Sequence, residues 1–236
     1  MKMTDMLTQI QIETRYFCNL RCDFCPNSIK EPTGHYMPMP LFEKILADMK
    51  DIGFRNRITL YLRNEPLADE RILEMIEYTR KMFPDNRINI STNGVLLTEN
   101  IMFKLFQAGL TDMDISCYTD DMFLKWSKFS SNSIAVHDIV DSPGWLNNRG
   151  GYIKAGRDEV GVGFCGRPFI QLYITSEGKC VLCCNDFMED VVMGNLDTQT
   201  ITEVWESDIY REYRNKQTTN KRAELKLCST CNYEGF

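Results

Sequence analysis

Shortly after its first predicted strand, the chain reads Cys18-Asn19-Leu20-Arg21-Cys22-Asp23-Phe24-Cys25-Pro26. Three cysteines in one short loop suit soft metal ions and iron–sulfur clusters. A four-iron cluster held by three cysteines keeps one iron without a protein ligand, and that iron can bind a small chelating molecule. Taken alone, these residues leave two other interpretations open: a zinc site that shares a distant fourth cysteine, or thiols buried in the core.

The composition of the 236-residue chain is that of an ordinary soluble protein, with 43% hydrophobic and 25% charged residues. Its net charge of −6 argues against nucleic acid or an anionic membrane as a partner. No apolar run approaches the roughly 18 residues of a membrane span, and the first residues lack the apolar core of a signal peptide. We therefore expect a cytoplasmic protein.

The cysteine and histidine counts narrow the chemistry. The chain has ten cysteines and two histidines, His35 and His137. In a reducing cytoplasm, ten cysteines point to metal binding rather than to a disulfide framework. Scarce histidine removes most Ser/His/Asp-type and histidine-rich metal sites, so we expect thiolates to carry the chemistry.

Strand and helix patterns alternate through the first part of the chain. Five strands are predicted, at 7–13, 58–62, 87–91, 113–117 and 134–136. The helices between them are predicted at 40–52, at 69–83, from the N-cap Thr98 to Gly109, and at 120–128. This alternation predicts parallel β/α units, whose ligands gather at the carboxyl ends of the strands.

A second, cysteine-rich region follows. We predict a division into residues 1–150 and 151–236, with one helix over 201–215 in the second part. Thr200 and Glu203 have the spacing of a capping box at the start of that helix.

The first cysteine motif resembles the C-x3-C-x-aromatic-C signature of radical S-adenosylmethionine (SAM) enzymes. The resemblance implies an abbreviated, partial (β/α) TIM-like barrel. It also implies that Cys18, Cys22 and Cys25 hold a [4Fe–4S] cluster whose free iron binds SAM. In that family SAM is cleaved to a 5′-deoxyadenosyl radical that abstracts hydrogen from a substrate. Phe24 matches the aromatic residue that lies near the adenine of SAM.

Further matches to this family follow in chain order. Asn64-Glu65-Pro66 resembles its Gly-Glu-Pro motif, whose acidic residue meets the SAM ammonium group. Ser91-Thr92-Asn93-Gly94 resembles its Thr-Asn-Gly turn, which implies that Thr92 and Asn93 contact SAM. Ser116 ends the fourth strand, where a polar SAM contact is common in the family. The alternative for Glu65 is a solvated carboxylate.

The remaining cysteine pattern resembles the SPASM/twitch extension of radical SAM proteins. That resemblance implies that Cys165, Cys183, Cys228 and Cys231 hold one auxiliary [4Fe–4S] cluster. A structural zinc site with four cysteine ligands is the alternative for this spacing.

Residues 145–196 further resemble a compact branch of the family that oxidises cyclitol alcohols with one auxiliary cluster. Asn148-Arg149-Gly150-Gly151 carries this likeness, and it makes Arg149 the candidate catalytic residue at the substrate. The predicted substrate is a small molecule (a sugar, cyclitol or nucleoside-like compound) whose secondary alcohol becomes a ketone. The implied electron donor is a reductase, ferredoxin or flavodoxin. Ser91, Cys117 and Cys184 depart from the branch and alter the pocket.

Other functions compete with this one. An epimerase would need a thiol hydrogen donor, for which Cys117, Cys180 and Cys184 are candidates. A peptide-modifying SPASM enzyme and a non-catalytic metal-binding module are further alternatives. One deoxyadenosine and one ketone per SAM consumed would select the dehydrogenase.

Overall fold

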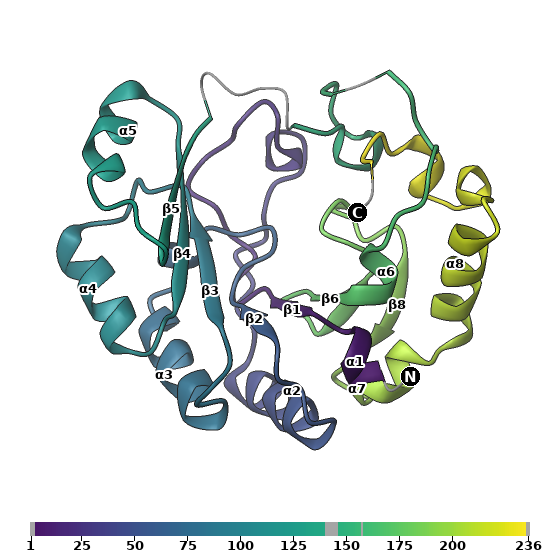
Figure 1. The fold of residues 1–236 in the computed structure, drawn as a ribbon, viewed down its shortest axis with the longest axis horizontal. Coiled ribbons are helices and arrows are strands. Elements are labelled where there is room, and N and C mark those ends of the chain that lie inside the picture. Colours follow the sequence, from purple (N-terminus) through teal and green to yellow (C-terminus); the bar gives the residue numbers. More distant parts are fainter. Residues whose placement is uncertain (1–2, 140–145, 157, 235–236) are drawn as a thin grey trace.

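One curved sheet forms the centre of the structure, a computed structural model that describes residues 3–139, 146–156 and 158–234. Within these residues the sheet has eight strands in the order β5-β4-β3-β2-β1-β6-β7-β8 (Figure 1). The strands are β1 (Gln9–Ile12), β2 (Arg57–Thr59), β3 (Ile88–Thr92), β4 (Asp112–Cys117), β5 (Ile134–Asp138), β6 (Gln171–Ile174), β7 (Lys179–Val181) and β8 (Val192–Asn195). Strands β1 to β5 pair in parallel, each with the next, which confirms the predicted β/α order.

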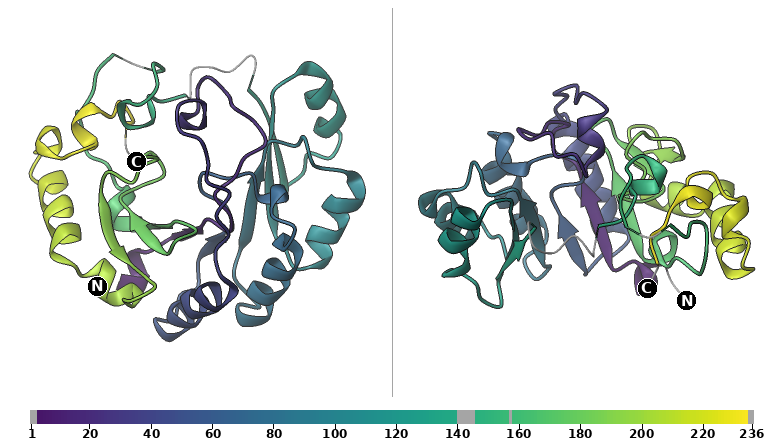
Figure 2. Two further views of the ribbon diagram at one scale, coloured as in Figure 1. Left: turned by 180° about the vertical axis from the view of Figure 1, so that it is seen from behind. Right: turned by 90° about the horizontal axis from the view of Figure 1, so that it is seen from above.

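Helices cover the outside of this sheet. They are α1 (Met3–Met6), α2 (Met39–Asp51), α3 (Ile72–Met82), α4 (Glu99–Gln107), α5 (Asp120–Ser127), α6 (Arg167–Ile170), α7 (Ile201–Trp205) and α8 (Asp208–Thr218). Helices α2 to α5 flank the half of the sheet formed by β1 to β5, and α7 and α8 flank β8 at the opposite side (Figure 2). In the described part of the chain, none of the helices combines the length and apolar character needed to cross a membrane.

Side-chain caps begin several helices where the sequence predicts them. Thr98 Oγ1 accepts a hydrogen bond from the backbone N–H of Ile101 at the start of α4. Thr200 and Glu203 form both hydrogen bonds of the capping box at the start of α7. These caps bond the N–H groups that the first helical turn cannot pair.

The single helix predicted at 201–215 is wrong, because the chain breaks into α7 and α8. Ser207 has extended backbone and accepts a hydrogen bond from the N–H of Tyr210, so it caps a new helix. Arg214 ties the two helices together: its guanidinium lies 4.1 Å from the Trp205 ring centroid and donates to the Trp205 carbonyl oxygen at 2.7 Å. The apolar positions continue across the break, which is why the periodicity predicts one helix.

The strand predicted at 58–62 ends earlier than expected. Strand β2 covers Arg57–Thr59, and the chain then leaves the sheet. Tyr61 and Leu62 line a cavity instead of pairing with a neighbouring strand. The short strand therefore supplies residues to the site.

Residues beyond 150 extend the same sheet. Strand β6 pairs in parallel with β1 on the side opposite β2, and β7 and β8 add an antiparallel edge. The five predicted strands therefore fall one short of the parallel set within the described residues. The division into residues 1–150 and 151–236 stays a prediction, because strands on either side of the boundary, β1 and β6, are hydrogen-bonded to each other.

Candidate active site

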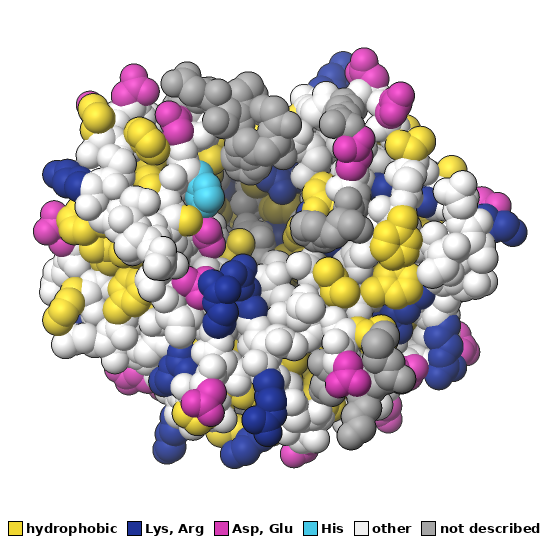
Figure 3. Space-filling view, in the orientation of Figure 1, with side chains coloured by type: hydrophobic (Ala, Val, Ile, Leu, Met, Phe, Trp, Pro, Cys, Tyr) yellow, Lys and Arg dark blue, Asp and Glu magenta, His cyan; other side chains and the backbone are white. Residues whose placement is uncertain are grey.

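A cavity of about 330 Å³, the main cavity, opens at the carboxyl ends of the parallel strands (Figure 3). Segments that follow β1, β2, β3 and β4 line it. Its lining includes eleven residues singled out in the sequence: Cys18, Cys22, Phe24, Cys25, Glu65, Ser91, Thr92, Asn93, Ser116, Arg149 and Cys184. The structure therefore gathers the residues predicted for the first cluster, for SAM and for the substrate around one space.

The three cysteines of the first motif lie in the loop after β1. The sulfur of Cys18 accepts a hydrogen bond from Asn93 Nδ2 at 3.8 Å, and the backbone N–H of Asn27 hydrogen-bonds Cys25. Burial raises the pKa of Cys18 and of Cys25, and it raises the pKa of Cys22 to about 11 with help from the neighbouring cysteines. Metal-free protein therefore holds these groups as thiols, and binding of a cluster must release their protons.

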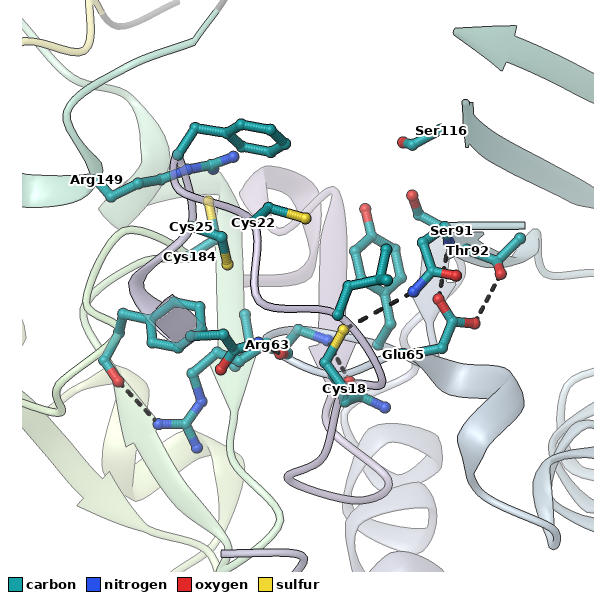
Figure 4. A pocket seen from close by; sticks show the side chains of 18 of the residues that line it. Cys18, Cys22, Cys25, Arg63, Glu65, Ser91, Thr92, Ser116, Arg149 and Cys184 are labelled. Carbon is teal, nitrogen blue, oxygen red and sulfur yellow. Dashed lines mark hydrogen bonds between the residues drawn. The ribbon is translucent and has the colours of Figure 1, made fainter. Parts of the chain in front are cut away.

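Glu65 is buried at the edge of this cavity, with 2% of its surface exposed. Its carboxylate accepts hydrogen bonds from Thr92 Oγ1 at 2.7 Å, the Asn93 backbone N–H at 2.7 Å and the Leu67 N–H at 3.1 Å (Figure 4). Burial raises its pKa, and the three hydrogen bonds act in the opposite direction. Burial excludes the solvated-carboxylate alternative, and Asn64 Oδ1 holds the preceding turn by accepting the Leu62 N–H.

Aromatic and hydroxyl groups form the side of the cavity above β4. Phe24 stacks on Tyr118, with ring centroids 5.8 Å apart and an angle of 18° between the rings. The Ser116 hydroxyl acts on the pKa of Tyr118 in the lowering direction, whereas burial, the larger effect, raises it. A flat apolar surface beside a hydroxyl pair can accept an aromatic base and bond its polar edge.

Arg149 reaches the cavity from the opposite side to Glu65 and Ser116 (Figure 4). Its backbone φ is +51°, a left-handed conformation that is uncommon outside glycine and is concentrated at functional sites. Its Nε is buried and has no hydrogen-bond partner among the described residues. Asn148 holds the segment in place by donating Nδ2 to the Thr230 carbonyl oxygen at 2.7 Å. Arg149 lines the main cavity, so its guanidinium can donate hydrogen bonds to a molecule bound there.

A buried ion network, which the sequence reasoning missed, forms the floor. Arg63 pairs with Glu13 at 2.7 Å and with Glu189 at 2.8 Å, and its guanidinium lies 4.3 Å from the Tyr16 ring centroid. Glu13 and Arg63 follow β1 and β2, whereas Glu189 lies between β7 and β8. Because both carboxylates hold it, Arg63 is a structural link between the two halves of the chain.

A second, smaller cavity brings together the four distant cysteines Cys165, Cys183, Cys228 and Cys231. Gln217 Nε2 donates to the Cys228 sulfur at 3.7 Å, and Asn185 Nδ2 donates to the Cys231 sulfur at 3.6 Å. Burial raises the pKa of Cys165 and Cys183, and that of Cys228 to about 12. We call this space the four-cysteine cavity.

The donor sets of the two cavities fit iron–sulfur clusters. In a four-iron cluster each thiolate binds a different iron, so three cysteines leave one iron open and four cysteines close the cluster. All-sulfur donors that also accept N–H hydrogen bonds are typical of such clusters.

The three remaining cysteines lie in two different environments. Cys117 in β4 and Cys180 in β7 are fully buried in the hydrophobic core. Cys184 instead lines the main cavity, beside Cys183 of the four-cysteine cavity. The hydroxyl of the buried Tyr173 donates a hydrogen bond to Gln171 Oε1. The expectation that Cys117 shapes the pocket is therefore wrong, because its side chain faces the core.

Family comparisons agree with this geometry. Residues 12–135 match the model of the radical SAM superfamily. The chain belongs to the radical SAM superfamily. Residues 165–232 match SPASM, an iron–sulfur cluster-binding domain, and this range contains all four cysteines of the four-cysteine cavity. In a radical SAM protein, the two matches together imply SAM and two iron–sulfur clusters as cofactors.

Individual relatives resemble the chain over different lengths. The SAM-dependent 2-deoxy-scyllo-inosamine dehydrogenase of Niallia circulans is 25% identical, over 98% of this chain and 94% of the relative. The crystal structure of BtrN in complex with AdoMet and 2-DOIA has a TM-score of 0.86 at 25% identity, covering 96% of this chain and 93% of BtrN. GTP 3′,8-cyclase of Clostridium acetobutylicum is 34% identical, but over 52% of this chain and 39% of the cyclase.

Sequence reasoning missed several residues that line the main cavity of this radical SAM protein. They are Gln11, Tyr61, Arg63, Tyr118 and Phe187. Tyr61 belongs to the run that predicts a longer strand, and Tyr118 directly follows β4. Both positions lie at carboxyl ends of strands, so their place in the chain was an available signal. Arg63 and Phe187 carry no local pattern that marks them.

Proposed function

We propose that this protein is a radical SAM dehydrogenase that oxidises a secondary alcohol of a cyclitol or amino-cyclitol to a ketone. Similarity to 2-deoxy-scyllo-inosamine dehydrogenase over nearly the full length of both chains supports this reaction class. The observation that carries the proposal is the shared wall, where Cys183 lines the four-cysteine cavity and Cys184 lines the main cavity. An alcohol that loses one hydrogen atom needs a nearby acceptor for its second electron, and here the two spaces are separated by consecutive residues.

Seven cysteines would hold the metal centres. Cys18, Cys22 and Cys25 would bind the SAM-binding cluster, and Cys165, Cys183, Cys228 and Cys231 the auxiliary cluster. When bound, SAM and the first cluster supply a hydrogen-abstracting 5′-deoxyadenosyl radical, and the auxiliary cluster supplies an acceptor for one electron. A single auxiliary cluster, the twitch form, is the arrangement we propose, because Cys117 and Cys180 are buried in the core.

Six residues of the main cavity would position SAM. Phe24 and its stacking partner Tyr118 offer a flat surface for the adenine. Glu65 would accept the amino group of the methionine part, since a buried carboxylate gains most from a charged or strongly polar donor. Thr92 and Asn93 hold Glu65 in that orientation, and Ser116 offers a hydroxyl beside Tyr118.

Arg149 would orient the reacting hydroxyl group. After a hydrogen atom leaves the carbon, one proton and one electron must still leave before the ketone is complete. A guanidinium stays protonated in proteins, so Arg149 is not the base. Arg149 lines the main cavity, so its guanidinium can donate to the substrate oxygen and stabilise negative charge there while the proton passes to water.

The test is product analysis on anaerobically reconstituted protein. With dithionite, SAM and 2-deoxy-scyllo-inosamine as the probe substrate, we expect one 5′-deoxyadenosine and one ketone for each SAM consumed. Arg149→Met should lower ketone formation by about 100-fold or more, as loss of a preorganised donor does, and leave SAM binding intact. Absence of ketone from this substrate and from related cyclitols would contradict the proposal.

An epimerase is the second candidate, and the position of Cys184 favours it. Its thiol lines the main cavity and could return a hydrogen atom to a substrate radical. Product that gains solvent deuterium without forming a ketone would select the epimerase. Cys184→Ala would then abolish turnover, whereas a dehydrogenase should retain ketone formation in this variant.

We also propose a cytoplasmic setting, where reducing conditions keep cysteine thiols available for metal. The electron donor would be a reductase, ferredoxin or flavodoxin that reduces the first cluster. A net charge of −6 disfavours nucleic acid and anionic membranes as partners.

A further inference from the structure

Two arginines line the four-cysteine cavity, and among the described residues no acidic side chain lines it. Arg167 begins α6, and its guanidinium lies 3.6 Å from the ring centroid of Tyr233. Arg222 is 2% exposed and donates to three backbone carbonyl oxygens, those of Val162, Cys231 and Tyr233. Both side chains therefore carry positive charge in a confined, largely apolar space.

Within the described part of the chain, neither guanidinium forms an ion pair with a carboxylate. Across residues 3–139, 146–156 and 158–234, no salt bridge joins Arg167 or Arg222 to an Asp or Glu. The groups that act most strongly on Arg167 are the thiols of Cys183 and Cys184 and the hydroxyl of Tyr173. A buried charge without a counter-charge is strongly unfavourable, and a guanidinium cannot lose its proton. The cavity is therefore built to receive negative charge.

The sulfur atoms are surrounded by donors that act in the same direction. The backbone N–H groups of Arg167 and Asn185 act on the Cys165 and Cys183 thiols in the direction that lowers the pKa of each thiol. The Tyr233 N–H donates to the Cys231 sulfur at 3.4 Å, and side-chain amides donate to Cys228 and Cys231. The hydrogen bonds to Cys228 and Cys231 favour the reduced state of a cluster.

The main cavity differs from the four-cysteine cavity in the charged residues that line it. Its Arg63 is neutralised by Glu13 and Glu189, and Glu65 adds a buried carboxylate opposite Arg149. Arginine is therefore paired with carboxylates in the main cavity and unpaired among the described residues that line the four-cysteine cavity, although the buried Asp186, outside that lining, acts on Cys228. An electron released in the main cavity finds a more positive environment across the Cys183–Cys184 wall.

We infer that Arg167 and Arg222 poise the auxiliary site to accept an electron, by stabilising the extra negative charge that a thiolate-bound cluster gains on reduction. This inference rests on the proposed function, which places the auxiliary cluster in the four-cysteine cavity. In the oxidation of the alcohol, one electron leaves the substrate with one proton after the hydrogen atom is gone, and that electron is the one accepted here. Arg167 acts through the cluster and does not touch the substrate.

The experiment measures the midpoint potential of the auxiliary cluster alone. The full chain carrying Cys18→Ala, Cys22→Ala and Cys25→Ala is reconstituted anaerobically with iron and sulfide, and its potential is followed by EPR during a redox titration. Arg167→Met in this background should shift the potential to a more negative value. Arg167→Lys keeps the positive charge, so its midpoint potential should stay close to that of the parent. Arg211→Met removes an exposed cation of α8 and should leave the potential unchanged.

The outcomes separate the inference from the function on which it rests. Iron content and the EPR line shape report whether each variant holds its cluster. If Arg167→Met does not take up iron, Arg167→Gln replaces it in the same titration. The inference is overturned if the neutral variants have the midpoint potential of the parent. It is also overturned if the potential of Arg167→Lys is as negative as that of Arg167→Met. In both cases the auxiliary site itself stands. A triple-cysteine parent that takes up no cluster overturns the auxiliary site itself, and the inference with it.

Discussion

At the scale of single residues, Glu65 shows how burial prepares a carboxylate for a ligand. Its oxygens already accept three hydrogen bonds, from Thr92, Asn93 and Leu67, which fix its orientation. Its pKa is nevertheless raised, because burial outweighs these bonds in the SAM-free protein. The ionised group therefore costs folding free energy at neutral pH, a cost relieved as the pH falls below its raised pKa. A donor group from a ligand relieves the same cost without protonation.

Glu65→Gln tests this role. We expect SAM to bind about 10- to 100-fold more weakly, since a charge-assisted hydrogen bond contributes about 1.5–3 kcal/mol. In the parent protein, SAM affinity should fall as the pH is lowered over the range that spans the raised pKa of Glu65, because protonation removes the carboxylate charge. Glu65→Gln should lack the part of this pH dependence that comes from protonation of Glu65.

Anaerobic calorimetry or equilibrium dialysis across this pH range gives the comparison. Glu43→Gln, an exposed change on α2, is the control and should bind SAM like the parent. Equal affinity and an equal pH profile for Glu65→Gln would mean that the carboxylate faces no part of SAM.

At the scale of elements, the 3-10 turn η4 (Arg149–Gly151) connects the two cavities. Gly150 has φ of +74°, and a Cβ there would stand 2.5 Å from Leu227 Cδ1 and 3.1 Å from the Asn185 carbonyl oxygen. Thr230, in the turn η6 (Cys228–Thr230), donates its hydroxyl to the Gly150 carbonyl oxygen at 2.7 Å. The turn that presents Arg149 is thus packed against the segment that carries the last two cysteines.

Gly150→Ala should displace Arg149 and strain the turn. We expect a loss of about 1–3 kcal/mol in the free energy of unfolding, the usual cost of a side chain at positive φ. Ketone formation should fall by a larger factor than SAM binding, because the clash lies on the substrate side. Denaturant unfolding and product assays under anaerobic conditions measure the two effects.

Gly163→Ala is the matched control for this change. Gly163 has a similar φ of +71°, and a Cβ there would meet nothing within 4 Å. It therefore reports backbone strain without the clash. Identical ketone yields from the two variants would contradict the role given to η4.

At the scale of the whole molecule, the two cavities share one framework. Strand β6 pairs with β1, so the sheet runs unbroken from the half that supplies the first cysteines to the half that supplies the others. The buried Arg63 forms ion pairs with Glu13, which follows β1, and with Glu189, which lies between β7 and β8, so it links the same two halves. This continuity fixes the wall at Cys183 and Cys184 between the two spaces.

Iron counting tests the two-site arrangement. Reconstituted protein should hold about eight irons per chain and no stoichiometric zinc, since each four-iron cluster contributes about four. Replacing Cys18, Cys22 and Cys25 by Ala should leave about four irons, and replacing the four cysteines of the other cavity should leave about four. Cys117→Ala should keep the parent count, because its thiol is buried in the core. About four irons with one zinc in the parent would contradict the auxiliary cluster.

Local chemistry in the sequence determined the first site. The spacing of Cys18, Cys22 and Cys25 after a strand, with Glu65 and Thr92-Asn93 after the next two, already predicted that these groups meet. Parallel β/α units bring the carboxyl ends of their strands to one edge, so residues placed there by the sequence need no further information to converge. The strand order β1 to β5 followed from the same alternation.

Other features depend on contacts between distant parts of the chain, and only the tertiary structure decided them. Strand alternation does not tell which cysteine faces a cavity once the backbone leaves the strand, so Cys184 reaches the main cavity while Cys117 and Cys180 enter the core. The pairing of β6 with β1 and the position of Arg63 join segments more than 100 residues apart in the chain. Arg167 meets Cys228 and Cys231, which lie more than 60 positions later. Such contacts form because burial and charge are balanced over the whole molecule, and no local pattern encodes that balance.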